Sequence, residues 1–562
     1  MYDVCRHRTF WNRNRGLNRF TIHNQSKIII FAEKIEKERI MIKPYPIGRQ
    51  DFKAIIEDGY AYVDKTERMY EMIKNRTFVF LSRPRRFGKS LLINTLQQYF
   101  EGNKDLFKDL KISRLEKDWI KYPIFRFDMS SYKDLPVESM SYAISNAISK
   151  YEKEYSIKSS DKLGNGERFK NVIEAAYKQT GRKAVVLIDE YDSPLLAHLH
   201  DGKLADVKPV LQELYQQVKV NEQFEQFVFI TGISRFSQVS IFSTLNNLEN
   251  ISMDDAFCDI CGITQDEMME NFKEDIGEFA KNEEISFDDM VQKLKTKYDG
   301  YHFSKKKTDV FNPLSVLSAF SKKELKNFWF ETATSSYVID HLKKHNAQIL
   351  DFEGVQMFES GFYASYEDVR SVYPLLYQAG YLTIKDYDRE SEVYTLSYPN
   401  SEVRVSMLEV LMPSWVGCST DDGKINMQKF YFALKAGRID DAFELLKEFF
   451  LQIPNVLNNK NEKHFQTVIY VLFRWLGFYT QSEVNTSKGR LDCILFAPKQ
   501  IFIIEFKVDE CAEKALAQIN EKGYADPYHT DGRPIIKIGV NFSSEERTIE
   551  GWKVEEELKV KN

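Results

Sequence analysis

Cysteine and long apolar runs are scarce in this sequence. There are six cysteines in 562 residues, and the one close pair, Cys258 and Cys261, has no second pair or histidine cluster near it to complete a zinc site. We therefore expect free thiols in a reducing compartment. No run reaches the ~20 apolar residues that a membrane-spanning helix needs. Both absences predict a cytoplasmic protein that has no membrane partner.

Net positive charge is lacking as well. The chain has 78 Lys and Arg against 83 Asp and Glu, which gives a formal net charge of −5. This excludes a generally basic surface for nucleic acid, so phosphate contacts must come from local clusters such as the three lysines at 305–307. Hydrophobic residues make up 43% of the chain, enough for several cores. At about 150 residues per domain, the length predicts roughly four units.

Repeats and long low-complexity tracts are absent, and the apolar pattern divides the chain into segments. Residues 1–40 show little periodicity, so we expect a disordered extension or an upstream start there. Short strand patterns alternate with helical stretches over 41–245, which predicts a parallel sheet with helices on both faces. The later units are expected to be a helical lid over 246–330, a winged-helix-like region over 331–404, a helical connector over 405–455 and a second α/β domain over 456–562.

The stretch FVFLSRPRRFGKSLLI at 78–93 has the order strand, loop, Gly-Lys-Ser, helix that binds nucleotide phosphates. Loop amides and the helix N-terminus supply a positive dipole, while Lys89 is expected to reach the β and γ oxygens and Ser90 to ligate Mg²⁺. Arg83 occupies the position of the first glycine in the standard pattern. The expected ATP contacts are Arg85, Arg86, Phe87, Gly88, Lys89, Ser90 and Leu91.

Two later strand ends support the same site. The apolar run AVVLIDEYD ends in Asp189 and Glu190. In nucleotide hydrolases the first acid of such a pair holds magnesium through water and the second orients the attacking water. Thr231 ends another apolar run, where a sensor of the γ-phosphate would lie. Arg235 is a candidate charge stabiliser, although a single arginine is at least as often a surface residue.

The C-terminal region carries two acids at facing positions. Residues 490–508 (RLDCILFAPKQIFIIEFKV) predict two strands joined at Pro498–Lys499. With that turn, Asp492 faces Glu505 across the hairpin, about 5 Å apart at the β-carbons. Two facing carboxylates repel unless a cation lies between them. Oxygen ligands of this kind suit Mg²⁺ or Mn²⁺.

A lysine accompanies the acid pair. Lys507 lies two residues beyond Glu505 on the same face of the strand, where it can neutralise a scissile phosphate or position a water molecule. The alternative is an internal salt bridge in a structural hairpin. That alternative leaves Asp492 facing another acid without explanation.

Further candidates lie on either side. Glu483 comes before the first strand of the hairpin and is a candidate metal ligand or helps to align the preceding helix. Downstream, Lys514, Gln518 and Lys522 recur every fourth residue and so share one helix face. That face could meet a phosphate backbone, or it could simply be solvated.

These motifs resemble a known bacterial family. Residues from about 44 to 330 are similar to a AAA-ATPase-like domain whose P-loop reads RPRRFGKS, present here at 83–90, and in that family the first glycine is usually missing. The runs PIGRQDF, YVDKT, LIDEYD, ITGISRFS and YDGYHF match its other landmarks. The middle region resembles the lid and winged-helix part of signalling ATPases. The resemblance implies a P-loop fold that uses ATP and Mg²⁺.

The last hundred residues resemble the nuclease domain that is commonly fused to it, of the PD-(D/E)XK type. The resemblance implies that Asp492 and Glu505 are metal ligands and that Lys507 is the catalytic lysine. Gln518, within ALAQINEKGY, matches the glutamine of that family's helix, and Glu483 is a further candidate ligand.

The sequence therefore predicts an α/β multi-domain protein that binds ATP, with Glu190 serving hydrolysis and Asp492, Glu505, Lys507 and Gln518 serving metal-dependent cleavage of DNA. The process, whether defence, mobile-element movement or repair, stays open, as does assembly into a homo-oligomer. The alternative is a non-catalytic ATP switch whose C-terminal domain binds nucleic acid or a partner, with recognition near 371–398. The two differ in whether DNA is cut when a divalent metal is present.

Overall fold

The computed structural model describes most of the chain from residue 43 onward. The described residues are 43–158, 162–199, 201–234, 247–329, 338, 342, 352–363, 372–407, 429–430, 432–434, 436–451, 479–486, 489–497 and 499–557, with side chains described for all of these except 479–490, 530 and 557. The extension expected over 1–40, the candidate Arg235 and the turn residue Pro498 lie outside this set.

A five-stranded parallel sheet organises the N-terminal part, in the order β2-β3-β4-β1-β5. Its strands β1 and β3 are buried along their whole length, as expected for a parallel sheet covered on both faces. The strands are β1 (Phe78–Ser82), β2 (Ile124–Asp128), β3 (Ala184–Asp189), β4 (Glu225–Gly232) and β5 (Glu249–Asn250).

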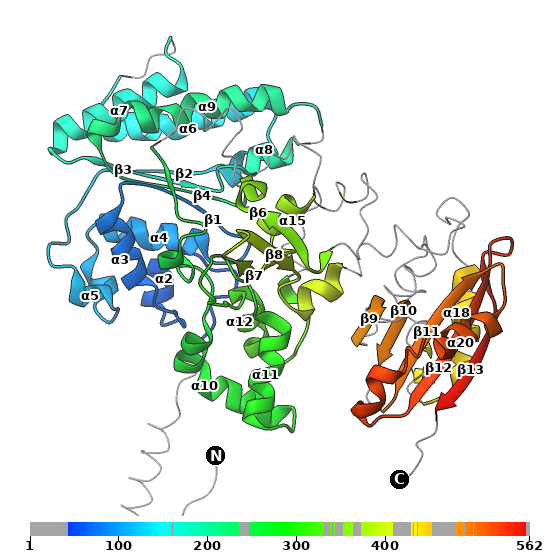
Figure 1. The fold of residues 1–562 in the computed structure, drawn as a ribbon. Coiled ribbons are helices and arrows are strands. Elements are labelled where there is room, and N and C mark those ends of the chain that lie inside the picture. The colour runs from blue at the N-terminus through cyan, green and yellow to red at the C-terminus, as the bar shows by residue number, and fades with distance from the viewer. Residues whose placement is uncertain are drawn as a thin grey trace, which may run out of the picture.

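Helices cover both faces of this sheet, which confirms the expected architecture (Figure 1). One layer contains α6 (Val137–Glu154), α7 (Asn165–Thr180), α8 (Ser193–Ala197) and α9 (Leu204–Val220). The other layer contains α2 (Phe52–Glu57), α3 (Thr66–Asn75) and α4 (Lys89–Phe100), with the short α5 (Ile112–Leu115) beside them. Buried apolar side chains fill the space around the strands, among them Val79, Val186 and Phe229.

Three helices with a core of their own follow the parallel sheet. They pack around side chains such as Met268, Ile276, Leu294 and Phe320. The first of them begins with a capping box, in which the Thr264 hydroxyl and the carboxylate three residues on satisfy each other's backbone amides. The helices are α10 (Gln265–Asn282), α11 (Phe287–Tyr298) and α12 (Pro313–Lys322).

A small antiparallel sheet of three strands lies in the middle of the chain, in the order β6-β8-β7. Helix α15 (Tyr373–Ala379) leads into β7 (Thr383–Asp388), which pairs with β8 (Val393–Ser397), while β6 (Val355–Phe358) pairs with the other edge of β8. A helix followed by a hairpin is the arrangement that the sequence predicts for 371–398.

The C-terminal part is a mixed sheet in the order β13-β12-β11-β10-β9, in which only the β11–β12 pair is parallel. Helix α20 (Ala512–Glu521) connects that parallel pair, as a crossover must. The strands are β9 (Tyr479–Thr486), β10 (Gly489–Phe496), β11 (Ile501–Val508), β12 (Ile535–Ser543) and β13 (Thr548–Glu557).

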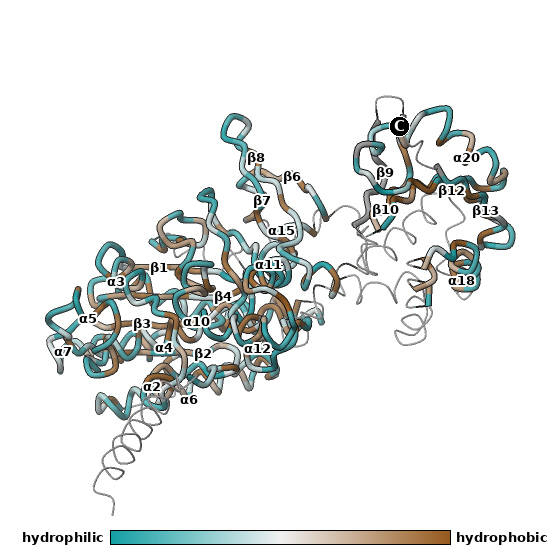
Figure 2. The backbone as a smooth tube through the Cα atoms, turned by 90° about the horizontal axis from the view of Figure 1, so that it is seen from below, coloured by the Kyte–Doolittle hydropathy of each residue, from teal (hydrophilic) through white to brown (hydrophobic). Residues whose placement is uncertain are grey.

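Helix α18 (Ile439–Leu451) falls in the expected connector but packs against this C-terminal sheet (Figure 2). The indole Nε1 of Trp552 donates to Asp440 Oδ1 at 2.9 Å, and the same ring stacks on Phe443 at 5.6 Å. The Thr548 hydroxyl donates to the carbonyl of Lys447. The helix therefore contributes to the core of the C-terminal unit. None of the described helices is long and apolar enough to cross a bilayer.

A buried acid at the start of β4 gives a first testable prediction. Glu225 is 2% exposed, and within the described part of the chain neither of its carboxylate oxygens has a hydrogen-bond partner. Burial raises its pKa to about 9, far above the value of about 4.3 expected in the unfolded chain. Stability from this group is therefore present below the unfolded pKa and is lost as the pH rises toward 9.

Glu225→Gln should remove the loss of stability that occurs as the pH rises, because glutamine does not ionise. We expect the variant to be more stable than the wild type by about 3 kcal/mol at pH 7, with the gain vanishing near pH 4. Calorimetric melting between pH 4 and 8 measures the difference, with Glu138, an exposed acid on the first turn of α6, changed to Gln as the control. A gain that does not vary with pH would contradict the assignment.

Candidate functional site

The loop between β1 and α4 has the geometry of a phosphate-binding loop. Strand β1 ends at Ser82, and α4 begins at Lys89. Two residues of the loop adopt left-handed backbone angles: Gly88, the residue before the helix, has φ 92°, and Arg86 has φ 70°. The glycine adopts this angle without strain. The loop thus brings its backbone amides to the N-terminus of a helix, where anions bind.

Arg83, at the position of the missing first glycine, is a buried anchor. Its guanidinium donates to the carbonyls of Ser82 and Ser252 at 2.9 and 2.8 Å and to the carbonyl of Phe257 at 3.1 Å. It also lies over the ring of Phe303, 4.3 Å from the ring centre. The arginine therefore ties the end of β1 to the segment 252–257. The departure from the standard motif has a structural cause in this chain.

The side chain of Lys89 lies inside the loop. It is 6% exposed, and its Nζ donates to the carbonyls of Arg83 and Pro84, each at 2.9 Å. Burial lowers the pKa of this lysine, while the charges of Glu190 and Asp189 act in the opposite direction. Phosphate oxygens would offer the ammonium stronger, charged acceptors than two neutral carbonyls.

Asp189 and Glu190 lie at the carboxyl end of β3, next to the start of α4. The Ser90 hydroxyl is near enough to Asp189 to favour its ionised form, but burial outweighs this effect and raises the pKa of that carboxyl to about 6. The backbone amide of Glu190 donates to Asp189 Oδ1 at 3.0 Å. Glu190 has φ 47°, a left-handed angle that costs an ordinary residue about 1 kcal/mol or more. The two expected magnesium ligands, Ser90 and Asp189, therefore lie near each other.

Thr231 lies opposite Leu81 in the β1–β4 register, near the loop. Its hydroxyl is buried, and the described residues provide it with no hydrogen-bond partner. Such an orphaned donor beside a phosphate loop is free to bind a ligand oxygen or a water. Its role as a sensor of the γ-phosphate stays a prediction.

Sequence reasoning missed the importance of Asp192, the last residue of LIDEYD. Its buried carboxylate accepts from the amides of Ile233 and Ser234 and from the Ser234 hydroxyl. A Cβ at Gly232 would lie 2.6 Å from Asp192 Oδ1 and from the ring of Tyr191. Only glycine fits there, and the carboxylate fixes the chain that leaves β4.

A cavity of about 90 Å³ adjoins the loop beside Gly88 and Leu91. Its walls come from three parts of the chain: the segment before α3, the first turns of α4, and the segment from 260 onward. The other expected contact residues differ in exposure. The Phe87 ring is buried against Tyr301 at 4.7 Å, so only its backbone is available to a phosphate, whereas Arg86 is exposed.

The C-terminal hairpin has the predicted register. Cys493 pairs with Ile504, which places Asp492 opposite Glu505. Beyond that pair, carboxylate oxygens accept the amide hydrogens that backbone carbonyls of the facing strand would otherwise accept. The amide of Asp492 donates to Glu505 Oε2 at 3.4 Å, and the amide of Phe506 donates to Asp492 Oδ2 at 2.8 Å. The strands therefore separate where the acids lie between them.

The other candidates in this domain converge on the same place. Glu505 is 2% exposed, and Lys507 Nζ lies 3.7 Å from its Oε1. The same oxygen accepts a hydrogen bond from the side-chain amide of Gln518 on α20. Tyr524, which sequence reasoning missed, is buried and lies near Gln518. The sequence feature that could have identified Tyr524 is its position just after the helix, six residues beyond Gln518.

Glu483 adds a third acid to the row. The β9–β10 register pairs Ser482 with Cys493 and Val484 with Leu491, so the backbone places Glu483 opposite Asp492. Its side chain lies outside the described set. Among the side chains that are described, no group of three His, Cys, Asp or Glu forms a ready metal cage.

The donors present fit a hard divalent cation. Mg²⁺ keeps several waters and is usually bound by one or two carboxylates together with substrate phosphate, so a full protein cage is not required. Asp492 and Glu505 supply two carboxylates at facing positions. In the N-terminal site Ser90 and Asp189 supply the hydroxyl and carboxylate that accompany nucleotide phosphates.

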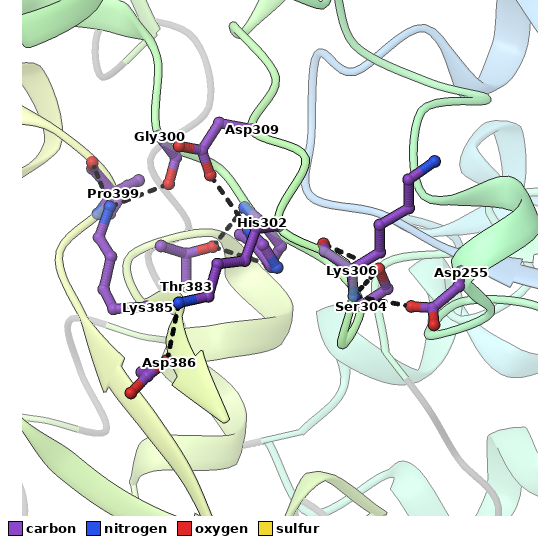
Figure 3. A network of polar contacts seen from close by, with 11 residues as sticks. Asp255, Gly300, His302, Ser304, Lys306, Asp309, Thr383, Lys385, Asp386 and Pro399 are labelled. Atoms are coloured by element: carbon purple, nitrogen blue, oxygen red, sulfur yellow. Dashed lines mark hydrogen bonds and ion pairs between the residues drawn. The ribbon is translucent and has the colours of Figure 1, made fainter. Parts of the chain in front are cut away.

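Some of the lysines considered as phosphate contacts form ion pairs with acids of the protein. Lys514 is exposed and forms an ion pair with Glu510 at 3.2 Å, which fits a solvated helix face. In the lysine run at 305–307, Lys305 pairs with Glu359 and Lys307 with Asp386. Figure 3 shows this loop beside β7, where Lys307 pairs with an acid of the protein although its side chain remains 83% exposed.

Comparisons with known proteins identify the families of both domains. A family model described as a predicted AAA-ATPase matches residues 46–242, and one for the PD-(D/E)XK nuclease superfamily matches 460–552. A protein of Azotobacter chroococcum mcd 1, named "Uncharacterized protein in vnfD 5'region", is 33% identical over 527 residues, which cover 91% of this chain and 99% of that protein.

One similar solved structure is that of the Aeropyrum pernix ORC1 protein in complex with DNA. It is 11% identical, covers 61% of this chain and 91% of its own, and has a TM-score of 0.24, too low to carry an argument. The family assignment rests on the two family models and on the Azotobacter relative. The chain belongs to the family in which a predicted AAA-ATPase domain is joined to a C-terminal domain of the PD-(D/E)XK nuclease superfamily.

Proposed function

We propose that this protein binds and hydrolyses ATP at the 83–90 loop and cleaves DNA phosphodiester bonds at its C-terminal carboxylates with Mg²⁺ or Mn²⁺. The observation that carries the cleavage proposal is the row of acids across β9, β10 and β11, with Asp492 and Glu505 interleaved and Lys507 beside them. A structural hairpin has no need for adjacent carboxylates that repel one another.

The ATP proposal is supported by the convergence of three elements. Lys89 is poised on neutral carbonyls that phosphate oxygens would replace as acceptors. Ser90 and Asp189 lie near each other, as the first ligand and the outer carboxylate of a magnesium site would. The adjoining cavity has mostly apolar walls, which suit the flat face of a nucleotide base.

In the cleavage site the chain's own residues have separable tasks. Asp492 and Glu505 would hold the divalent ion, which when bound lowers the pKa of a water molecule and stabilises negative charge on the phosphate. Gln518 fixes the Glu505 carboxylate by donating to Oε1. The Lys507 ammonium is close enough to the same oxygen to meet a phosphate oxygen or the attacking water.

A substrate panel tests the proposal. Linear, circular and single-stranded DNA are incubated with the full chain in Mg²⁺, Mn²⁺ or Ca²⁺, each with and without ATP, and Glu505→Ala serves as the blank. We expect cleavage with Mg²⁺ or Mn²⁺ and none from the variant. Binding without cleavage in every metal would instead support a non-catalytic ATP switch. Equal cleavage by wild type and variant would exclude the assigned site.

A further inference from the structure

The phosphate loop is held from outside by two groups that lie beyond the matched ATPase segment. The indole Nε1 of Trp329 donates to the carbonyl of Arg85 at 3.2 Å. The amide of Gly262 donates to the carbonyl of Phe87, also at 3.2 Å. Both donors come after residue 242, where the match to the predicted AAA-ATPase ends.

These two hydrogen bonds determine which way the loop amides point. In a planar trans peptide the carbonyl oxygen and the following N–H point in opposite directions. Because the carbonyl of Arg85 is directed at Trp329, the amide of Arg86 is directed away from it. The amide of Gly88 is directed away from Gly262 for the same reason. Inward-facing amides of this kind are the groups that bind phosphate at a helix N-terminus.

The indole of Trp329 is itself fixed in place. The residue is fully buried, and its ring contacts Tyr381 edge-on at 5.4 Å. Its backbone amide donates to Glu402 Oε1 at 2.9 Å, and the other oxygen of that buried acid accepts from the Ser315 hydroxyl at 2.7 Å. The position of the indole is therefore set by α12 and by the segment 401–407.

The small middle sheet touches the loop as well. Gly380, which ends α15, has φ 89°, and a Cβ there would lie 2.6 Å from Cβ of Pro84 and 3.4 Å from the Trp329 ring. A side chain could not enter this contact without moving the loop. The middle sheet and Trp329 thus form one packed unit against residues 84–85.

We propose that Trp329 is a positioning residue for ATP: its indole N–H holds the 85–86 peptide so that the Arg86 amide faces the phosphates. The inference rests on the proposed ATP site. It adds that phosphate affinity depends on the region after residue 300, because Glu402 and Ser315 fix the indole that fixes the loop.

Trp329→Phe tests the inference, because it removes the N–H and keeps an aromatic ring. We expect the Kd for ATP, measured by calorimetry on the full chain, to rise roughly three- to tenfold, the effect of one lost hydrogen bond. The Kd for adenosine, measured by equilibrium dialysis, should change less than about twofold, because adenosine has no phosphate. If Trp329 had only a structural role, the substitution would weaken the binding of ATP and of adenosine to a similar extent.

The matched control is Trp119→Phe. The indole nitrogen of Trp119 is buried and donates to nothing in the described part of the chain, so ATP affinity should not change. If circular dichroism shows Trp329→Phe to be unfolded, Ser315→Ala carries the test with an expected two- to fivefold loss of ATP affinity. If the folded variant binds ATP as tightly as the wild type, the role of Trp329 is disproved and the ATP site is unaffected. If the wild type binds no ATP, the ATP site itself is disproved.

Discussion

Asp492→Asn should abolish metal-dependent DNA cleavage while the C-terminal sheet stays folded. The asparagine oxygen can still accept from the amide of Phe506, so the strand contact persists. The variant loses the charge that attracts a divalent ion, and a metal-stabilised transition state is worth several kcal/mol. We therefore expect the cleavage rate to fall about a thousandfold or more. Calorimetric titration with Mn²⁺ should show weaker binding independently of activity.

The control for this change is a surface acid of the same domain. Glu513 is exposed in the first turn of α20 and pairs with Lys553 at 3.3 Å. Glu513→Gln removes one negative charge from the same domain without touching the acid row, so cleavage and Mn²⁺ binding should stay at the wild-type level. Wild-type cleavage by Asp492→Asn would disprove the assignment of the site.

The C-terminal hairpin illustrates what the sequence could predict. Side chains alternate along a strand, and a two-residue turn fixes the register, so facing positions follow from counting. Asp492 and Glu505 came together for that reason. The P-loop could likewise be predicted, because strand, loop, glycine and helix are adjacent in the chain.

Contacts between distant segments could not be predicted in this way. The structural role of Arg83 could not be predicted, since its partners Ser252 and Phe257 lie about 170 residues further along the chain. The ion pairs of Lys305 with Glu359 and of Lys307 with Asp386 could not be predicted either, because nothing near the lysine run indicates these acids. Helix α18 has a strong apolar face, but no local signal says which sheet that face covers.

Glu190→Gln should separate ATP binding from ATP hydrolysis. Glutamine keeps the size of the side chain and the backbone amide that donates to Asp189 Oδ1. It cannot take a proton from water, and loss of such a base typically costs about 10²–10⁴ in rate. We expect the Kd for ATP to stay within about twofold and the hydrolysis rate to fall by that factor, measured by calorimetry and phosphate release.

The left-handed backbone angle of Glu190 is a reason to expect the loss of hydrolysis at this acid and not at an ordinary surface acid. A strained backbone persists only where the surrounding structure enforces it, and here the chain turns sharply after β3, beside Asp189 and close to Lys89. Glu138→Gln, on the exposed first turn of α6, is the matched control and should hydrolyse ATP normally. If Glu190→Gln hydrolyses ATP as fast as the control, the strained turn serves the fold, and the attacking water must be oriented by another group.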